Sequence, residues 1–237
     1  MRNKVGLEVG QKIQTQTGEI EVLNVDRQKI TVRFDDGYET VALKTNVLKG
    51  NVRNPNFKSY FGVGYRGAGS HTMHGKLSYN KWHNMLVRCY DEEYKSQHPT
   101  YEGVHCCLEW HNYQNFTDWF HKQVGCGEKG FELDKDLLFK GNEIYSPETC
   151  ILVPQELNKI LGNTGIDRGI STRPDLNGKW MIRCNTIHGE ISLGCHPRTA
   201  AIKILIDFKL NYIKERAEFW KDRVDSKVYE ALMNFTF

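Results

Sequence analysis

Hydrophobic and polar side chains alternate along the first fifty residues, and this period of two is the feature that most restricts the fold. The alternation runs through residues 20–22, 30–34 and 38–42, and Asp35-Asp36-Gly37 separates the last two runs. Such alternation places apolar side chains on one face of a strand, and Asp-Gly favours a hairpin turn. Residues 1–50 are therefore predicted to form a small β meander or β barrel.

The hydrophobic period changes to a helical one after residue 77. Two stretches, "SYNKWHNMLVRCY" (residues 78–90) and "NYQNFTDWFHKQV" (residues 112–124), predict helices, the second capped by Asn115. The side chains expected to face inward are Trp82, Met85, Leu86, Cys89, Phe116, Trp119 and Phe120. Large aromatic residues are more often core than ligand-stacking groups, so we interpret them as packing.

Residues 133–150, "LDKDLLFKGNEIYSPETC", predict two short strands around a Lys-Gly-Asn turn. An apolar strand and a helix from Pro154 through Ile160 follow, and "GNTGIDRG" breaks the pattern. The remainder predicts three strands and a long helix with a stripe of Ala200, Ile204, Phe208 and Tyr212. The fold class is therefore α+β, with modules at residues 1–50, 51–165 and 166–237.

Glycine, asparagine and serine dominate residues 50–78, which indicates an extended linker or an ordered loop. The segment "GVGYRG" has the spacing of a dinucleotide-binding fingerprint, but no apolar strand precedes it and no helix start follows it. We therefore reject that function. Glycines here instead suggest a backbone that lies close to another surface, with DNA as one candidate.

Charge is distributed in blocks along the chain. Residues 40–90 contain eight lysines or arginines and no acidic residue, residues 91–167 are acidic, and residues 168–221 are again basic. Fifty-one consecutive residues without an acid are difficult to explain as an ordinary solvated face. This distribution predicts a polyanionic partner, and Arg66 and Lys76 are candidate contacts.

No apolar stretch is long enough to span a membrane, and the N-terminal residues do not resemble a secretory signal. The sequence thus predicts a cytoplasmic protein, in the host cytoplasm if a phage encodes it. Seven cysteines without a C-x-x-C pair predict free thiols rather than a disulfide framework. A structural Zn²⁺ site is an alternative that this spacing disfavours; its ligands would come from Cys89, His105, Cys106, Cys107 and Cys150.

Two carboxylates flank a lysine at Asp134-Lys135-Asp136, which is more than turn chemistry requires. Oxygen ligands suit Mg²⁺, which retains several waters and joins a carboxylate to a phosphate. Asn158 follows Asp134 by twenty-four residues, about the span of a ββα unit. The sequence therefore predicts a Mg²⁺ (or Mn²⁺) site between Asp134 and Asn158, although both side chains could instead be solvated surface groups.

The pattern "LDKD…GN…YSPETC…VP…LN" resembles the ββα-metal core of the HNH endonuclease family, especially its bacteriophage homing branch. The resemblance covers about residues 60–165. It implies that Asp134 is the metal-binding aspartate and Asn158 the helical ligand. Lys135 stands where the family has the histidine that acts as general base.

The lysine at position 135 leaves three hypotheses for the chemistry. A histidine elsewhere could act as base, with His71, His74 and His105 as candidates. The metal could activate water while Lys135 contacts phosphate, or the site could be inactive. A lysine of ordinary pKa is a poor base at neutral pH. Related phage proteins tend to carry a basic residue there, which favours a nuclease that works now or did so in the past.

The stretch "GISTRPDLNGKWMIRCNTIHGEISLG", followed by a helix containing "RTAAIKI", resembles the ethylene-response-factor-type DNA-binding domain. That resemblance implies that Arg173, Lys179, Trp180 and Arg183 face DNA, with Arg168 near the phosphates. Arginines and a tryptophan on a sheet can read the major groove. The alternative is that Trp180 belongs to the core and the cations are solvated.

These observations together predict a site-specific DNA endonuclease of the homing type, with Asp134 and Lys135 at the catalytic centre. One divalent ion would serve the hydrolysis, and the partner would be double-stranded DNA. The protein would be a monomer or a homodimer, because a double-strand cut needs two centres. The alternative is a DNA-binding protein without catalysis, and a third, weaker option is RNA or protein binding through residues 1–50.

Overall fold

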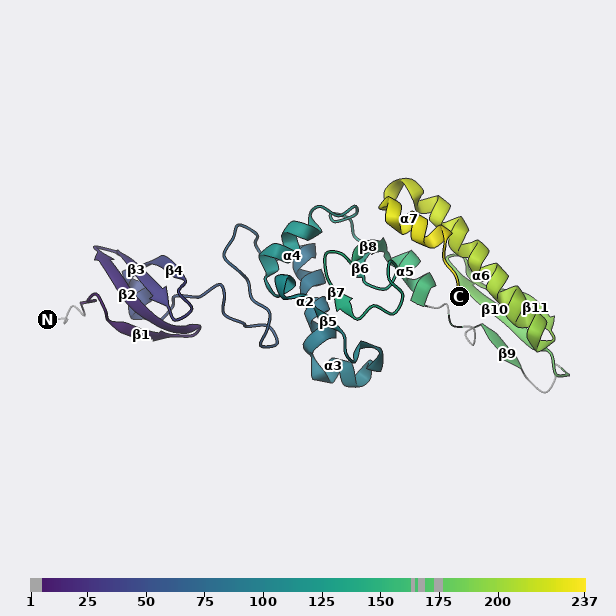
Figure 1. Ribbon diagram of the computed structural model, residues 1–237, viewed down its shortest axis with the longest axis horizontal. Helices are drawn as coiled ribbons and strands as arrows, with labels where there is room; N and C mark the ends of the chain where they lie inside the picture. The colour runs from purple at the N-terminus through teal and green to yellow at the C-terminus, as the bar shows by residue number, and fades with distance from the viewer. Residues whose placement is uncertain (1–5, 163–164, 166–168, 173–176) are drawn as a thin grey trace.

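The computed structural model describes residues 6–162, 165, 169–172 and 177–237. Its buried hydrophobic side chains form three clusters, one in each module. Figure 1 shows the three modules in chain order along the longest axis of the molecule, with the C-terminal helix turning back onto the middle module. The α+β class is confirmed, and the end of the chain contributes to the core of the middle module.

The N-terminal module is an open antiparallel sheet of four strands in the order β1-β2-β3-β4. The strands are β1 (Lys12–Thr15), β2 (Gly18–Asp26), β3 (Lys29–Phe34) and β4 (Glu39–Leu43), and helix α1 (Lys44–Leu48) follows directly. The predicted alternation is confirmed, since Ile20, Val22, Ile30 and Val32 are all fully buried.

The barrel alternative for this module is wrong. The edge strands β1 and β4 do not pair with each other, so the sheet does not close. Val47 of α1 and Val52 pack on the buried face of the sheet instead. A four-stranded sheet that is covered in this way buries its apolar face without closure.

The middle module packs α2 (Leu77–Tyr90) against α4 (Tyr113–Phe120) around an aromatic core. Trp82, Trp110 and Phe116 are fully buried, and the Trp82 indole donates a hydrogen bond to the Trp110 carbonyl at 2.7 Å. The interpretation of these aromatics as core is confirmed. The predicted N-cap of α4 is wrong by three residues, because the Asn112 side chain, not that of Asn115, accepts a hydrogen bond from the Gln114 backbone amide.

Small elements complete this module, and three of them, two paired strands and the helix that follows, form a ββα unit. They are α3 (Glu92–Gln97), β5 (His105–Cys106), β6 (Phe131–Asp134), β7 (Ile144–Tyr145), β8 (Ile151–Pro154) and α5 (Gln155–Gly162). Strand β6 pairs antiparallel with β8, and β7 pairs in parallel with β5. The predicted hairpin around Lys140-Gly141-Asn142 is therefore wrong. The partner of β6 is β8, which follows a loop (residues 135–143), the short strand β7 and a turn. Pro154 ends β8 instead of starting the helix.

The C-terminal module is an antiparallel sheet covered on one face by a long helix (Figure 1). Its elements are β9 (Ile170–Thr172), β10 (Trp180–Thr186), β11 (Gly189–His196) and α6 (Arg198–Trp220), and the chain ends with α7 (Ser226–Met233). Ala201 and Leu205 are the fully buried residues in the first half of α6, so the predicted stripe is displaced by one residue near its start. No helix in the described part of the chain is long and apolar enough to cross a membrane.

The second half of α6 and helix α7 belong to the core of the middle module. Ile213, Ala217 and Val228 join the same hydrophobic cluster as Trp82. The buried Arg216 guanidinium pairs with Glu156 of α5, and the Trp220 indole also donates to that carboxylate at 3.2 Å. These contacts fix the helix α5 to the helix that covers the C-terminal sheet.

Two of the three glycines of "GVGYRG" lie against the protein's own helices. A Cβ at Gly64 would meet the Leu86 and Trp82 side chains, and one at Gly67 would overlap the side chain of Asn112, which caps α4. Gly67 also has φ +74°, a region that favours glycine. The surface that this backbone approaches is therefore α2 and α4.

Gly67→Ala should lower the free energy of unfolding by about 2 kcal/mol, because the added methyl group displaces the Asn112 cap as well as straining φ. Gly62→Ala is the matched control, since Gly62 has φ +70° and nothing within 4 Å of the added atom. Urea denaturation of both variants measures the difference. Equal destabilisation would show that only φ matters and that the close approach does not.

Candidate metal and nucleic-acid site

Asp134 is the last residue of β6, and its carboxylate holds the start of the loop that follows. Its Oδ1 accepts hydrogen bonds from the amides of Asp136 at 2.9 Å and Leu137 at 2.7 Å. Burial raises the pKa of Asp134, and the two amide hydrogen bonds oppose that rise. Oδ2 has no hydrogen bond within the described residues and can therefore accept a cation.

Asn158 lies on α5, which packs against both β6 and β8. The residue is half-buried, and its amide forms no hydrogen bond to any described residue. Asp134 and Asn158 thus belong to one ββα unit, each with an uncommitted side-chain oxygen. A carboxylate and an amide oxygen fit Mg²⁺, which uses one or two protein ligands and keeps its waters.

Lys135 is buried and fully engaged within the loop. Its Nζ donates to both carboxylate oxygens of Asp136, at 2.8 and 2.9 Å, and to the Asn142 carbonyl. The side-chain amide of Asn142 in turn donates to the Lys135 carbonyl at 3.0 Å. All three ammonium protons are therefore used in closing the loop, and this arrangement leaves Lys135 no free role as a base.

Lys135→Met should lower the free energy of unfolding by about 2 kcal/mol, because it removes a buried cation from Asp136 and from a carbonyl. We place the effect below the range for fully buried pairs because the Asp136 side chain is 53% exposed. Lys140→Met is the control, since Lys140 is exposed in the same loop. Thermal unfolding that shifts equally in both variants would contradict the role given to Lys135.

The three histidines considered as bases occupy different surroundings. His71 lies 2.7 Å from Asp118 of α4, and no hydrogen bond to a described residue engages the exposed His74 side chain. His105 is exposed on β5, next to β7 at the end of the loop, and its Nδ1 lies 3.1 Å from the Gly103 carbonyl. A donated Nδ1 proton leaves Nε2 as an acceptor, which a general base requires. His105 is also the candidate whose strand pairs with the end of the loop, since its amide donates to the Glu143 carbonyl at 3.0 Å, so it is the histidine that we consider for that role.

Arg88 and Tyr101 lie beside this site, although sequence analysis did not single them out. The Arg88 guanidinium contacts the Tyr145 hydroxyl at 3.4 Å and lies 5.8 Å from the Tyr101 ring centroid. Burial raises the pKa of Tyr101; Arg88 lowers it, and Asp134 and Asp136 raise it further. One phenol therefore lies in the field of a cation and of both loop carboxylates.

All seven cysteines are free thiols, as predicted. Cys89 and Cys106 are buried neighbours, and the hydrogen bond that the Cys89 thiol donates to Cys106 raises the pKa of Cys89, as does burial. The described residues contain no group of three histidine, cysteine or acidic side chains that could hold a metal ion. A Mg²⁺ site with one carboxylate and one amide does not need such a group.

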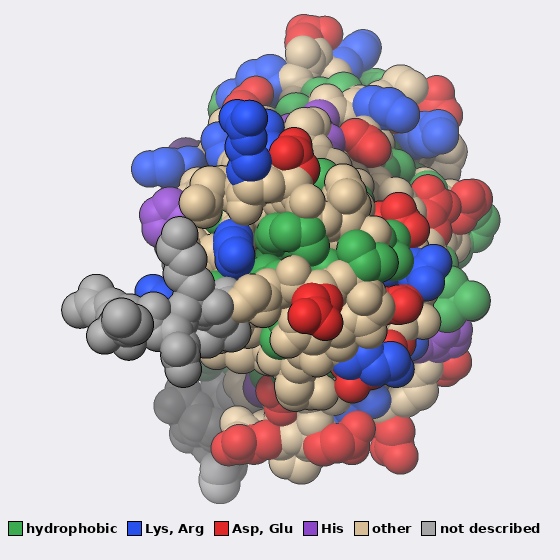
Figure 2. All heavy atoms as spheres, turned by 90° about the vertical axis from the view of Figure 1, so that its left-hand side faces the viewer, with side chains coloured by type: hydrophobic (Ala, Val, Ile, Leu, Met, Phe, Trp, Pro, Cys, Tyr) green, Lys and Arg blue, Asp and Glu red, His purple; other side chains and the backbone are tan. Residues whose placement is uncertain are grey.

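Arg66 lines a hollow of about 790 Å³ between the N-terminal sheet and the glycine-rich segment. Arg53 and His74 line it as well, with the aromatic side chains of Tyr38 and Tyr60, and no acidic residue is among the described lining residues. Lys76 is exposed immediately before α2, outside this hollow. Figure 2 shows mixed positive and negative side chains on the end of the molecule that carries the N-terminal sheet.

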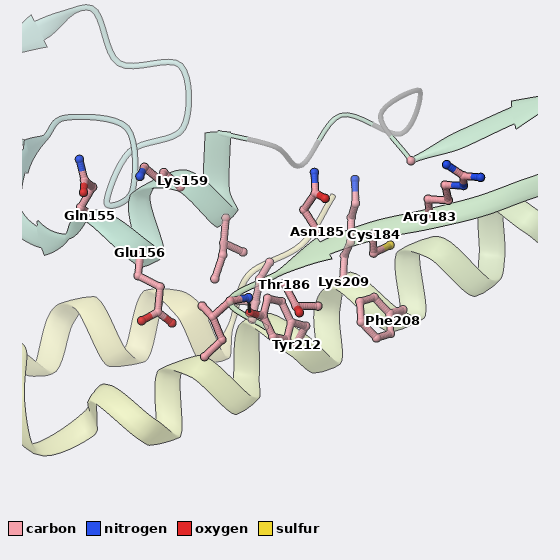
Figure 3. Close-up of a pocket in the computed structure, with 14 residues that line it drawn as sticks. Gln155, Glu156, Lys159, Arg183, Cys184, Asn185, Thr186, Phe208, Lys209 and Tyr212 are labelled. Atoms are coloured by element: carbon pink, nitrogen blue, oxygen red, sulfur yellow. Dashed lines mark hydrogen bonds between the residues drawn. The ribbon is translucent and has the colours of Figure 1, made fainter. Parts of the chain in front are cut away.

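The C-terminal sheet separates the side chains predicted to face DNA. Arg183 points away from α6, as Figure 3 shows, and pairs with Glu190 at 3.3 Å. Trp180 packs against the cluster between sheet and helix, with the Arg198 guanidinium 5.3 Å from its ring centroid. Lys179 is exposed before β10. The remaining predicted contacts, Arg168 and Arg173, lie outside the described residues.

A second hollow, of about 610 Å³, lies between α5, β10 and α6 (Figure 3). Lys159 of α5 and Arg183 of β10 both line it, so it joins the ββα unit to the C-terminal sheet. Phe208 and Tyr212 of α6 form its apolar side. The ββα unit that carries Asp134 and Asn158 and the C-terminal sheet therefore border the same hollow.

Comparisons with known proteins give no further assignment: no family model, no curated protein and no solved structure matches this chain. Both resemblances inferred from the sequence motifs therefore stay predictions. The geometry of Asp134, Asn158 and the cationic side chains is what supports a function.

Proposed function

We propose that this chain is a site-specific DNA endonuclease of the homing type that hydrolyses phosphodiester bonds with one Mg²⁺ or Mn²⁺. One observation carries the proposal: a β6–β8–α5 unit bears Asp134 at the end of its first strand and Asn158 on its helix. Each has a side-chain oxygen that forms no hydrogen bond to any residue the structure describes. This arrangement supports the HNH-like resemblance of the middle module.

The residues of the loop would prepare the site for the reaction. The Asp136 and Leu137 amides fix Oδ1 of Asp134 and so orient Oδ2. Lys135 and Asn142 close the loop around that carboxylate. A divalent ion bound there would lower the pKa of a water and stabilise the leaving 3′ oxygen. His105 would accept the proton of the attacking water.

Duplex DNA would be held by basic side chains outside the ββα unit. Arg66 and Lys76 in the acid-free segment, and Lys179 and Arg183 in the C-terminal module, supply cations for the phosphates. The C-terminal module would follow the ethylene-response-factor-type pattern in reading DNA. A single centre would nick one strand, and a homodimer would be needed for a double-strand cut.

Incubation with pooled phage and host DNA tests this function. We expect defined fragments or nicks in Mg²⁺ or Mn²⁺, and none in EDTA. Cleavage that persists in EDTA would exclude the metal, and tight binding without cleavage in any metal would exclude catalysis.

The full engagement of Lys135 favours a second candidate, a DNA-binding protein that lacks catalysis. The residue at the position of the family's base has every proton committed within the loop. In this candidate His105 does not act as a base and the protein binds DNA without cleaving it. Cleavage that His105→Gln abolishes would support the nuclease, whereas binding without cleavage in the unsubstituted protein would support the second candidate.

A further inference from the structure

Arg88 is a half-buried cation without a described anionic partner. It lies in the last turn of α2, and its one hydrogen bond to a described residue goes to the neutral hydroxyl of Tyr145 at 3.4 Å. No carboxylate of the described residues forms an ion pair with it. By contrast, the other well-buried arginine, Arg216, is paired with Glu156.

A guanidinium in this position has unused hydrogen-bonding capacity. It carries five N–H donors in a planar fork that matches phosphate and carboxylate. Arginine is rarely buried without a partner, because desolvation of a charge is costly unless an anion or hydrogen bonds offset it. Tyr101 and Tyr145 cover part of the group but supply no negative charge. An anion from outside the chain would complete the pairing.

The surroundings of Arg88 specify which anion fits. Arg88 contacts Tyr145, which follows Asn142 by three residues, and the Asn142 carbonyl accepts from Lys135, the neighbour of Asp134. The cation therefore lies beside the loop that begins at the candidate metal carboxylate. Arg88 is also the last base of the acid-free residues 40–90, whose charge favours a polyanion over a single small acid. A phosphate of a nucleic-acid backbone meets both conditions, because it can contact a guanidinium and a carboxylate-bound cation together.

We propose that Arg88 binds a backbone phosphate of the DNA next to the Asp134 site, with Tyr101 and Tyr145 holding the guanidinium in place. The inference rests on the proposed function and adds a residue that positions the substrate. Arg88 binds and orients the phosphate, and it takes no part in proton transfer or bond making. Its guanidinium geometry makes lysine an incomplete substitute.

Arginine Nε–Hε signals in the ¹⁵N NMR spectrum of the full chain test this directly. Arg88→Lys removes one signal and so assigns it. A short DNA duplex in EDTA, and separately inorganic phosphate, should shift that signal, whereas the signal of Arg33, which is paired with Glu21, should stay unchanged. An Arg88 signal that neither ligand shifts would overturn the inference.

DNA affinity supplies a second readout that a structural role would not change. Arg88→Gln should weaken duplex binding in EDTA about tenfold and reduce the slope of log K against log salt by about 0.9, the value for one phosphate. Arg88→Lys should retain most of that slope, and Arg33→Gln should leave it unaltered. An unchanged slope in a folded Arg88→Gln protein would contradict the proposal.

These experiments separate the inference from the proposed nuclease function. If the Arg88 signal shifts and the salt slope falls, but no metal supports cleavage, Arg88 binds phosphate on a protein that only binds DNA. If Mg²⁺-dependent cleavage occurs and the Arg88 signal does not shift, the nuclease stands and Arg88 is structural. Unfolding of each variant is followed by circular dichroism, so that loss of fold is recognised.

Discussion

Asp134→Asn is expected to reduce Mg²⁺-dependent DNA cleavage at least about 100-fold, since loss of supporting groups around a metal already costs 10- to 100-fold and Asp134 would be a direct ligand. Asparagine retains an oxygen that can accept the Asp136 and Leu137 amides, so the loop should stay in place. What the substitution removes is the negative charge that attracts the cation. Initial rates of supercoiled-plasmid nicking measure the effect.

Two comparisons make this result specific. Glu143→Gln removes an acid that is exposed in the same loop, and it should leave the nicking rate unchanged. DNA binding by Asp134→Asn in EDTA should equal that of the unsubstituted protein. Full nicking activity in Asp134→Asn would place the metal, and the chemistry, elsewhere.

Arg216→Met should lower the free energy of unfolding by about 3 kcal/mol, the second large effect. The Arg216 side chain is 6% exposed and Glu156 is 23% exposed, so the substitution leaves a largely buried carboxylate without its cation. The Trp220 indole would be the remaining partner of Glu156. Urea denaturation followed by tryptophan fluorescence gives the change.

A double-mutant cycle shows whether the pair itself is responsible. Glu156→Gln together with Arg216→Met should be less destabilised than the sum of the single variants, because neither charge is left alone. Additive effects would mean that Arg216 contributes through its packing on Phe219, where the guanidinium carbon lies 4.1 Å from the ring centroid. A strong coupling would confirm that α5, which carries Asn158, is fixed to α6 by this pair.

Position 135 shows how far a motif can be interpreted without coordinates. The motif places a lysine where the resembling family has a base, and this left three hypotheses. The structure directs Nζ into the loop, onto Asp136 and Asn142. The direction of a long side chain depends on which acceptors the folded loop brings near it, and the spacing of residues along the chain does not contain that information.

Local pattern was sufficient for most elements of secondary structure. Strand alternation from Ile20 to Phe34 and helical spacing around Trp82 depend on neighbours within a few residues, so they are legible in the chain. Strand pairing was not legible in the same way. The partner of β6 is β8 rather than the nearer β7, and open sheet or barrel depends on whether two edge strands meet.

The same distinction between local pattern and tertiary contact applies to the candidate site. The sequence by itself determined the α+β class, the aromatic core, the free thiols, and the occurrence of Asp134 and Asn158 with the spacing of a ββα unit. Only the tertiary structure decided that Arg88 lies beside the loop that follows Asp134, with no anionic partner among the described residues, and that Trp180 and Arg183 face opposite sides of the sheet. Periodicity is a property of neighbouring residues, whereas burial, pairing and electrostatic fields arise from segments that the fold brings together.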